Sequence, residues 1–183
     1  MDKLTRTHLD NIRSKDKELQ NKAYFYILNV TEKPVDWAYD VWDEMLAGLT
    51  HKDNHVRAIA AQILCNLAKS DPKERILEDF PALLEVTKDD QFVTARHCMQ
   101  ALWKVGVAGK KQQKAYMDGL ERRYKECLNE KNSTLIRYDI LQSMRNAYNT
   151  TKDEKIRKKA LELIPLEEDI KYRAKYAALW KGV

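Results

Sequence analysis

A helical pattern that returns every 36 to 41 residues is the feature that most limits what this chain can fold into. In its clearest copy, Asp53 is placed to cap a helix, and the apolar residue Val56 is followed by Arg57 at the start of an apolar helical face. The same apolar–arginine pair recurs at Ala95-Arg96, Ile136-Arg137 and Tyr172-Arg173, and in a weaker form at Leu19-Gln20. Five copies at this spacing indicate a helical repeat protein.

Two further positions of the pattern are apolar in every copy. The third residue after the second member of the pair is, in order, Ala23, Ala60, Met99, Ile140 and Tyr176. The seventh is Ile27, Leu64, Trp103, Met144 and Trp180. Residues three, four and seven apart share one face of a helix, so these two columns predict the buried core.

A second helical stretch precedes each copy, so the repeating unit is a helical hairpin. The expected helix pairs are 3–14 with 16–31, 35–49 with 53–69, 73–88 with 91–106, 110–129 with 133–148, and 151–164 with 167–181. Pro34, Pro72 and Pro165 fall in turns, whereas Pro81 lies inside a helix that it should bend or interrupt. A single hairpin cannot bury its own apolar face, so we expect the five repeats 3–31, 35–69, 73–106, 110–148 and 151–181 to stack into one domain spanning 1–183.

The turn into the second helix resembles the signature of HEAT repeats. Asp53, Val56, Arg57 and Ala60 match this signature directly, whereas the first repeat departs from it with Gln20 at the arginine position. The whole chain is also similar to uncharacterised bacterial HEAT-repeat proteins. This resemblance implies an all-α, armadillo-like fold, a right-handed α-α superhelix of ten helices. It also implies that second helices line the concave side.

Composition excludes several classes of protein. No stretch approaches the roughly 20 apolar residues of a membrane span, and the polar start lacks the apolar core of a signal peptide. The three cysteines are Cys65, Cys98 and Cys127, far apart and odd in number, which is typical of buried reduced thiols. We therefore expect a cytoplasmic protein without a membrane partner.

Positive charge is concentrated in the second half of the chain. Residues 1–90 carry a net charge of −4 and residues 91–183 a net charge of +9. Counting along the second helices from each arginine predicts a basic stripe on the concave side. Its candidate binding residues are Arg57, Arg96, His97, Gln100, Lys104, Arg137, Tyr138, Arg145, Arg173 and Lys181. Guanidinium groups at a fixed spacing suit carboxylates or phosphates.

The arginine column has a second interpretation, which the sequence leaves open. Each arginine could instead form an ion pair with an acidic residue in its own repeat or in the next one. Asp53 and Asp169 lie four residues before Arg57 and Arg173, a spacing that suits such a structural ladder.

Two tryptophans form a further candidate site. Trp37 and Trp42 are five residues apart in the expected helix 35–49, so they cannot easily face the same way. If one is partly exposed, it could anchor a partner helix or a second copy of the chain.

Catalytic chemistry finds little support, and we assign no catalytic, metal-binding or cofactor-binding residues. His51 and His55 lack a third metal ligand, and His97 and Cys98 should point to different faces. DNA alkylation-repair glycosylases are similar in using HEAT-like repeats with an acidic residue beside aromatics. Asp139 is the nearest candidate for such an acid, but it should point away from the basic stripe.

The sequence therefore predicts a non-enzymatic interaction scaffold that binds an acidic partner protein on a basic concave face. The alternative is a nucleic-acid-binding protein related to the alkylation-repair glycosylases. The oligomeric state and the identity of the partner are open at this point.

Overall fold

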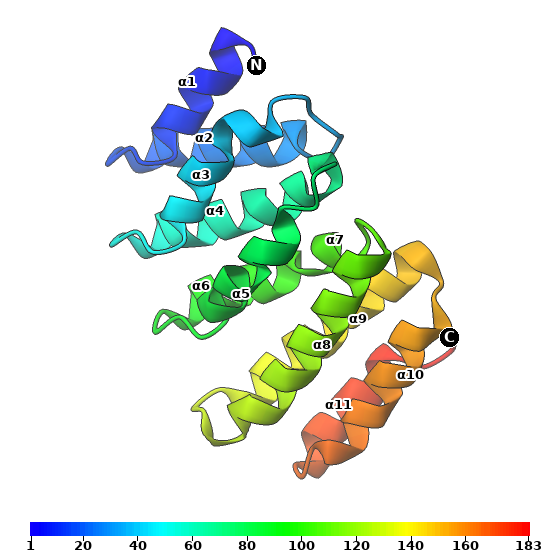
Figure 1. Cartoon of the computed structure of the whole chain (residues 1–183). Helices are drawn as coiled ribbons and strands as arrows, with labels where there is room; N and C mark the ends of the chain where they lie inside the picture. The colour runs from blue at the N-terminus through cyan, green and yellow to red at the C-terminus, as the bar shows by residue number, and fades with distance from the viewer. The chain divides into compact units, whose positions relative to one another are not determined.

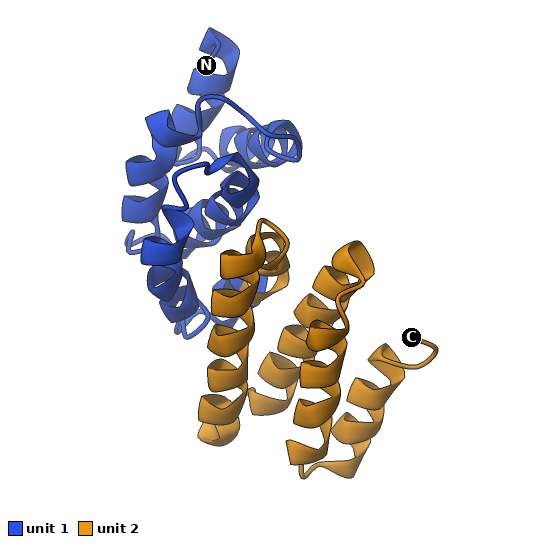
Figure 2. Cartoon of the chain, turned by 45° about the vertical axis from the view of Figure 1, so that its right-hand side comes forward, with its two compact units in different colours: residues 1–98 blue, residues 99–183 orange.

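The computed structural model describes all residues from 1 to 183 and is entirely helical (Figure 1). Helical hairpins follow one another along the chain and pack in sequence, as in a repeat solenoid. Packing of the backbone divides the chain into two compact units, unit 1 over residues 1–98 and unit 2 over residues 99–183 (Figure 2). The boundary falls within helix α6.

Unit 1 contains the first hairpins. Its helices are α1 (Lys3–Asn11), α2 (Lys17–Val30), α3 (Ala38–Gly48), α4 (Asn54–Leu67), α5 (Ile76–Val86) and the start of α6 (Phe92–Ala101). A short 3-10 helix, η1 (Ala68–Ser70), extends α4. Helix α1 packs against α2 and α3 packs against α4, and α2 and α5 also pack against α4.

Unit 2 contains α7 (Trp103–Gly106), α8 (Lys110–Glu126), α9 (Ser133–Thr151), α10 (Glu154–Leu163) and α11 (Ile170–Leu179). The 3-10 helices η2 (Cys127–Asn129) and η3 (Ile164–Leu166) extend α8 and α10. Helix α9 is central, since α7, α8, α10 and α11 all pack against it. None of the helices in the chain is long and apolar enough to cross a membrane.

The ten expected helices are all present, with one interruption. Leu102 separates α6 from α7, although its own backbone stays helical at φ −56° and ψ −27°. The interruption is therefore one tightened turn, in which the Val105 amide donates to the Leu102 carbonyl at 3.0 Å. Pro81 does not interrupt α5, which continues through it to Val86.

Helix starts follow from the capping residues. Asp16, Asp53, Asp153 and Asp169 each precede a helix, and each carboxylate accepts hydrogen bonds from amides in the first turn. Such caps satisfy donors that have no partner within the helix. The second helices of hairpins one, two and five and the first helix of hairpin five begin in this way.

The predicted core columns are confirmed. All five residues of the first column, from Ala23 to Tyr176, are buried. In the second column Trp103 is half-buried and the other four residues are buried. Trp180, at the end of this column, packs against Tyr148 with the ring centroids 5.8 Å apart.

Candidate binding surfaces on the second helices

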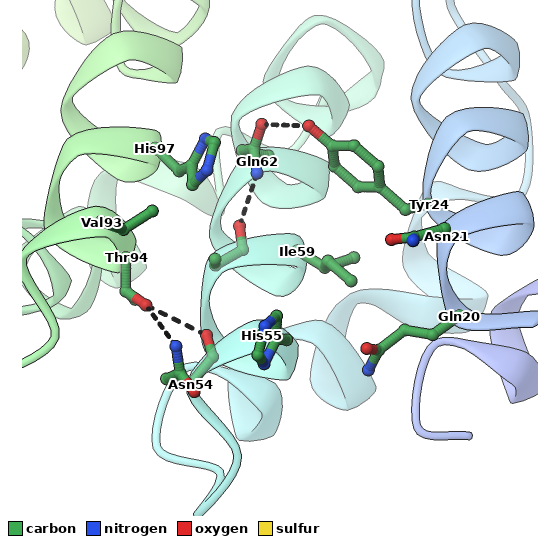
Figure 3. A pocket seen from close by; sticks show the side chains of 11 residues that line it. Gln20, Asn21, Tyr24, Asn54, His55, Ile59, Gln62, Val93, Thr94 and His97 are labelled. Atoms are coloured by element: carbon green, nitrogen blue, oxygen red, sulfur yellow. Dashed lines mark hydrogen bonds between the residues drawn. The ribbon is translucent and has the colours of Figure 1, made fainter. Parts of the chain in front are cut away.

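The second helices of unit 1 enclose a pocket of about 170 Å³ (Figure 3). Helices α2, α4 and α6 each contribute to its wall. The lining residues are Gln20, Asn21, Tyr24, Asn54, His55, Ala58, Ile59, Gln62, Val93, Thr94 and His97. None of these side chains is a carboxylate, an ammonium or a guanidinium, so the pocket is suited to an uncharged group.

Hydrogen bonds between neighbouring helices hold the pocket walls in place. The Tyr24 hydroxyl donates to the Gln62 side-chain oxygen at 3.0 Å, and the Gln62 amide donates to the Ala58 carbonyl at 3.0 Å (Figure 3). On the other wall, the Thr94 hydroxyl donates to the Asn54 carbonyl at 3.2 Å. The wall groups of α2, α4 and α6 are therefore fixed before anything binds.

The pocket combines apolar lining residues with polar groups that remain available. Ala58 and Ile59 contribute buried apolar side chains to its lining, whereas Val93 has 64% of its surface exposed. His97 is exposed as a residue, but part of its imidazole lies against the protein. This partial burial, and then the positive charge of Arg96, lowers the pKa of the imidazole. His97 is therefore neutral near pH 7, with one nitrogen that can donate and one that can accept.

Two arginines of the predicted stripe are used inside the fold. Arg57 donates two hydrogen bonds to Asp89, at 2.5 and 2.8 Å, and a third to the His51 carbonyl at 2.8 Å. Arg137, only 4% exposed, donates to Glu167 at 3.2 Å and to the Tyr124 carbonyl at 3.1 Å. Both acids belong to the loop of the following hairpin.

These pairs assign Arg57 and Arg137 to a structural ladder between consecutive hairpins. Arg57 does not pair with Asp53 of its own repeat, because Asp53 caps α4. The guanidinium of Arg57 forms its ion pair with Asp89 of the next hairpin. The residues one turn beyond the two arginines, Ala61 and Leu141, are completely buried. In α4 and α9 this stripe therefore turns toward the next hairpin and not toward open solvent.

The remaining predicted residues are more accessible. Arg173 on α11 is exposed, and so is Lys181, which follows the end of this helix. Gln100 is exposed and donates to Asp139 at 3.4 Å. Arg145 is half-buried, and its guanidinium donates to the Leu179 carbonyl at 2.6 Å.

Three further residues of the predicted stripe contact aromatic rings. The ring centroid of Tyr138 lies 6.3 Å from that of Tyr176. Arg96 and Lys104 are half-buried and lie over the rings of Phe92 and Trp103.

The tryptophan pair is not an exposed anchor. Trp37 lies at the N-cap of α3, outside the helix, so its direction is not set by helical geometry. It is 6% exposed, and Trp42 is fully buried with its indole nitrogen donating to Asp79 at 2.8 Å. Both rings pack into the core of unit 1.

The remaining polar clusters have structural roles. His51 and His55 flank Asp53, whose amide donates to His51 at 3.0 Å and whose carboxylate lies 3.0 Å from His55. Burial raises the pKa of the Cys98 thiol, which donates to the Leu83 carbonyl. Asp139 is buried at 1% exposure. No three His, Cys, Asp or Glu residues lie close enough together to hold a metal ion.

Most of the pocket in unit 1 was not among the predicted residues, which include only His97. A signal for it exists, because the residues one and five positions after the arginine column lie about 100° and 140° around the helix. In unit 1 the first of these positions holds Asn21, Ala58 and His97, which all line the pocket. The second holds Gln62, which lines it, and Phe25, which does not. The prediction followed the residues four and eight positions on, and two of these, Ala61 and Leu141, are buried.

Comparisons with known proteins support the fold and nothing finer. No family model matches the chain, and no curated protein matches it. Crystal structures of three engineered proteins from the Northeast Structural Genomics Consortium are similar to it, each over 98% of this chain. Their TM-scores are 0.54, 0.53 and 0.53, at 16%, 15% and 18% sequence identity.

The matched share of the engineered proteins differs. The alignments cover 47%, 95% and 80% of their chains, so this chain spans less than half of the first. The all-α fold of sequentially packed hairpins is thus shared with engineered proteins over nearly the entire chain.

Proposed function

We propose that this chain is a non-enzymatic interaction scaffold of the HEAT type, similar to uncharacterised bacterial HEAT-repeat proteins, that binds a partner protein on its second helices. The observation that carries this proposal is the pocket in unit 1, which three successive second helices line with uncharged side chains. An apolar lining beside fixed hydrogen-bonding groups suits an apolar side chain and the adjoining peptide of a protein segment. The exposed Phe25, next to Tyr24, adds apolar surface.

The charge of unit 2 supports an acidic partner. Arg173 on α11 and Lys181 just after this helix are exposed, and Arg145 is partly accessible on α9. An acidic segment gains favourable interactions with such cations and is steered toward them during encounter.

The ion pairs on the first helices of unit 2 favour a protein over a nucleic acid. Lys114 pairs with Asp118 at 2.5 Å, and Lys125 and Lys159 each approach Glu121 at 2.6 Å. These acids offset three of the basic residues of α8 and α10, whereas a phosphate backbone gains most from cations without such partners. The nucleic-acid alternative is therefore an outcome of the test below.

The free cysteine thiols support the proposal that the protein acts in a reducing compartment. All three cysteines are free and buried. We propose the cytoplasm as the place of action, since disulfides are rare there and free thiols persist.

The test compares two surface charge substitutions. Val93→Glu places a carboxylate in the lining of the pocket, and Leu161→Glu places one on the exposed face of α10. Proteins retained from a cell extract by immobilised wild-type chain should be lost with Val93→Glu and kept with Leu161→Glu. Both variants should melt at the wild-type temperature, since both positions are exposed.

Two results would count against the proposal. Retention that is equal for all three chains would remove the pocket from the interface. Retention of nucleic acid that falls by orders of magnitude between about 50 and about 200 mM salt would favour the polyanion alternative.

A further inference from the structure

The outer face of α11 carries Ile170, Arg173 and Ala177, which we call the α11 outer face. All three residues are exposed, and Ile170 has 73% of its surface in solvent. In the register of the repeat they occupy the position three residues before the arginine column, the column itself and the position four residues after it.

The same register positions are covered elsewhere in the chain. In α4, Asn54 bonds to Thr94 of the next hairpin at 3.5 Å and Ala61 is completely buried. In α9, Leu141 is completely buried, and α11 packs against the helix. The face that α11 exposes is therefore the face on which α4 and α9 receive the following hairpin.

Two of the received hairpins bring a carboxylate to the column arginine, whereas Glu130 in the loop of the fourth hairpin pairs with Arg123 of its own hairpin. Asp89 lies in the loop before α6, seven residues ahead of the next column residue, and meets Arg57. Glu167 lies in the loop before α11, six residues ahead of Arg173, and meets Arg137. The loop between the helices of the incoming hairpin thus supplies the acid in both cases.

The first hairpin shows the converse arrangement. Its column residue is Gln20 and not an arginine, and the loop of the second hairpin has Thr50 at the place seven residues before Arg57. The Gln20 amide donates to Ile12 within its own hairpin at 2.8 Å. The three pairs compared are hairpins one and two, two and three, and four and five. In these pairs, a column arginine occurs where the loop of the next hairpin carries a carboxylate.

We propose that the α11 outer face binds a helical hairpin of a partner protein whose inter-helix loop carries a carboxylate. Arg173 binds this carboxylate, and Ile170 and Ala177 pack against the second helix of the hairpin. This inference deepens the proposed function and rests on it, because it names the form of the acidic partner at Arg173. It does not depend on the pocket of unit 1.

The N-terminal hairpin of a second copy does not meet this requirement. Arg13 and Ser14 stand seven and six residues before Gln20, where Asp89 and Glu167 stand in their hairpins. The guanidinium of Arg13 pairs with Glu44 of its own chain at 3.3 Å, so neither of these two places offers a carboxylate to Arg173. A hairpin with an acidic loop therefore suits Arg173 better than the N-terminal hairpin of a second copy does.

The experiment uses the full chain with a probe hairpin joined to it. A second copy of residues 152–183 is appended after Val183, which holds an acidic-loop hairpin near the α11 outer face at a high effective concentration. Amide hydrogen exchange then measures whether the probe is protected. The probe should exchange about tenfold more slowly with Arg173 than with Arg173→Glu, the factor expected from a charge-assisted hydrogen bond.

A charge swap makes the result specific. Changing the glutamate of the probe that copies Glu167 to arginine should also remove the protection, and combining it with Arg173→Glu should restore it. Arg173→Glu in the chain without a probe should leave thermal stability unchanged, because Arg173 is exposed there.

Two outcomes would overturn this inference. One is a probe whose amides exchange freely, or whose protection is unchanged by Arg173→Glu and by the change of the copied glutamate to arginine. The other is self-association of the original chain in sedimentation that Arg173→Glu abolishes, since that would make a second copy the occupant. Neither outcome affects the Val93→Glu test, so failure here is distinguishable from failure of the proposed function.

Discussion

Buried carboxylate–guanidinium pairs are the residue-scale feature that links one hairpin to the next. Glu167 accepts from Arg137 and from the Tyr176 hydroxyl, at 3.2 and 3.1 Å, and its other oxygen caps the Asp169 amide. Arg137 also lies over the Tyr124 ring, 4.6 Å from its centroid. Burial of this kind makes each group depend on its partners, because an unpaired buried charge has lost its water.

Removal of the charge at Glu167 should be costly. Glu167→Gln leaves Arg137 without its counter-charge, and we expect the free energy of unfolding to fall by about 1.5–3 kcal/mol. Urea unfolding at neutral pH measures this change. Glu168→Gln is the matched control, since Glu168 is exposed and should change stability by less than about 0.5 kcal/mol. Equal effects of the two substitutions would contradict the structural role of the pair.

The second pair predicts a dependence on pH. The hydrogen bonds from Arg57 hold the pKa of the Asp89 carboxyl below its usual value of 3.8. A carboxyl whose pKa is lowered by folding stabilises the protein fully above its unfolded pKa, and this stabilisation is lost as the pH falls through the folded pKa. The stability difference between wild type and Asp89→Asn should therefore be full at pH 7 and shrink below about pH 4. Thermal melts from pH 7 down to pH 3 test this, and a difference that does not change with pH would refute it.

At the scale of the element, the helical hairpins were predictable because their determinants are local. Aspartates that cap a helix, two apolar columns and prolines in turns act within a few residues of one another. The pairing of Arg57 with Asp89 was not predictable in this way, since the two residues are 32 positions apart. The direction in which the arginine stripe faces depends on how each second helix packs against the following hairpin. These contacts between hairpins cannot be read from one helix alone.

The pocket of unit 1 was harder still to predict. It requires Tyr24, Gln62 and His97 to converge from three helices, and no single helix carries its pattern. Trp37 shows a related limit, because its burial follows from its place outside α3, one residue before the helix begins.

The end of α9 offers a prediction about one element. Lys152, its C-cap, is held in the left-handed region at φ 53° and ψ 26°. Glycine adopts this conformation without the steric cost of a side chain, so Lys152→Gly should raise the free energy of unfolding by about 0.5–1 kcal/mol. Thr151→Gly, one residue earlier in the helix, should instead lower it by up to about 1 kcal/mol. Urea titration of both variants checks the sign, and a destabilised Lys152→Gly would contradict the cap geometry.

At the scale of the whole molecule, the chain comprises two compact units with their own buried residues. Leu9, Val41 and Ile63 are completely buried in unit 1, and Leu120 and Ile140 in unit 2. Repeat proteins are stabilised by contacts between neighbours, so a local defect weakens the nearest hairpins most.

A core truncation should show this locality. Leu120→Ala removes a completely buried side chain of α8, and we expect a loss of about 2–5 kcal/mol in stability. Amide hydrogen exchange should accelerate more in residues 99–183 than in residues 1–98. Equal acceleration in both ranges would mean that the chain opens as one cooperative body.

The three buried thiols give each unit its own chemical reporter. Cys65 and Cys98 belong to unit 1 and Cys127 to unit 2, and all three are shielded from solvent. A thiol reagent can reach them only when the surrounding helices open, so the alkylation rate of each cysteine follows the opening of its own hairpins. Mass spectrometry of partly alkylated chain would then resolve the opening of the two units without any introduced label.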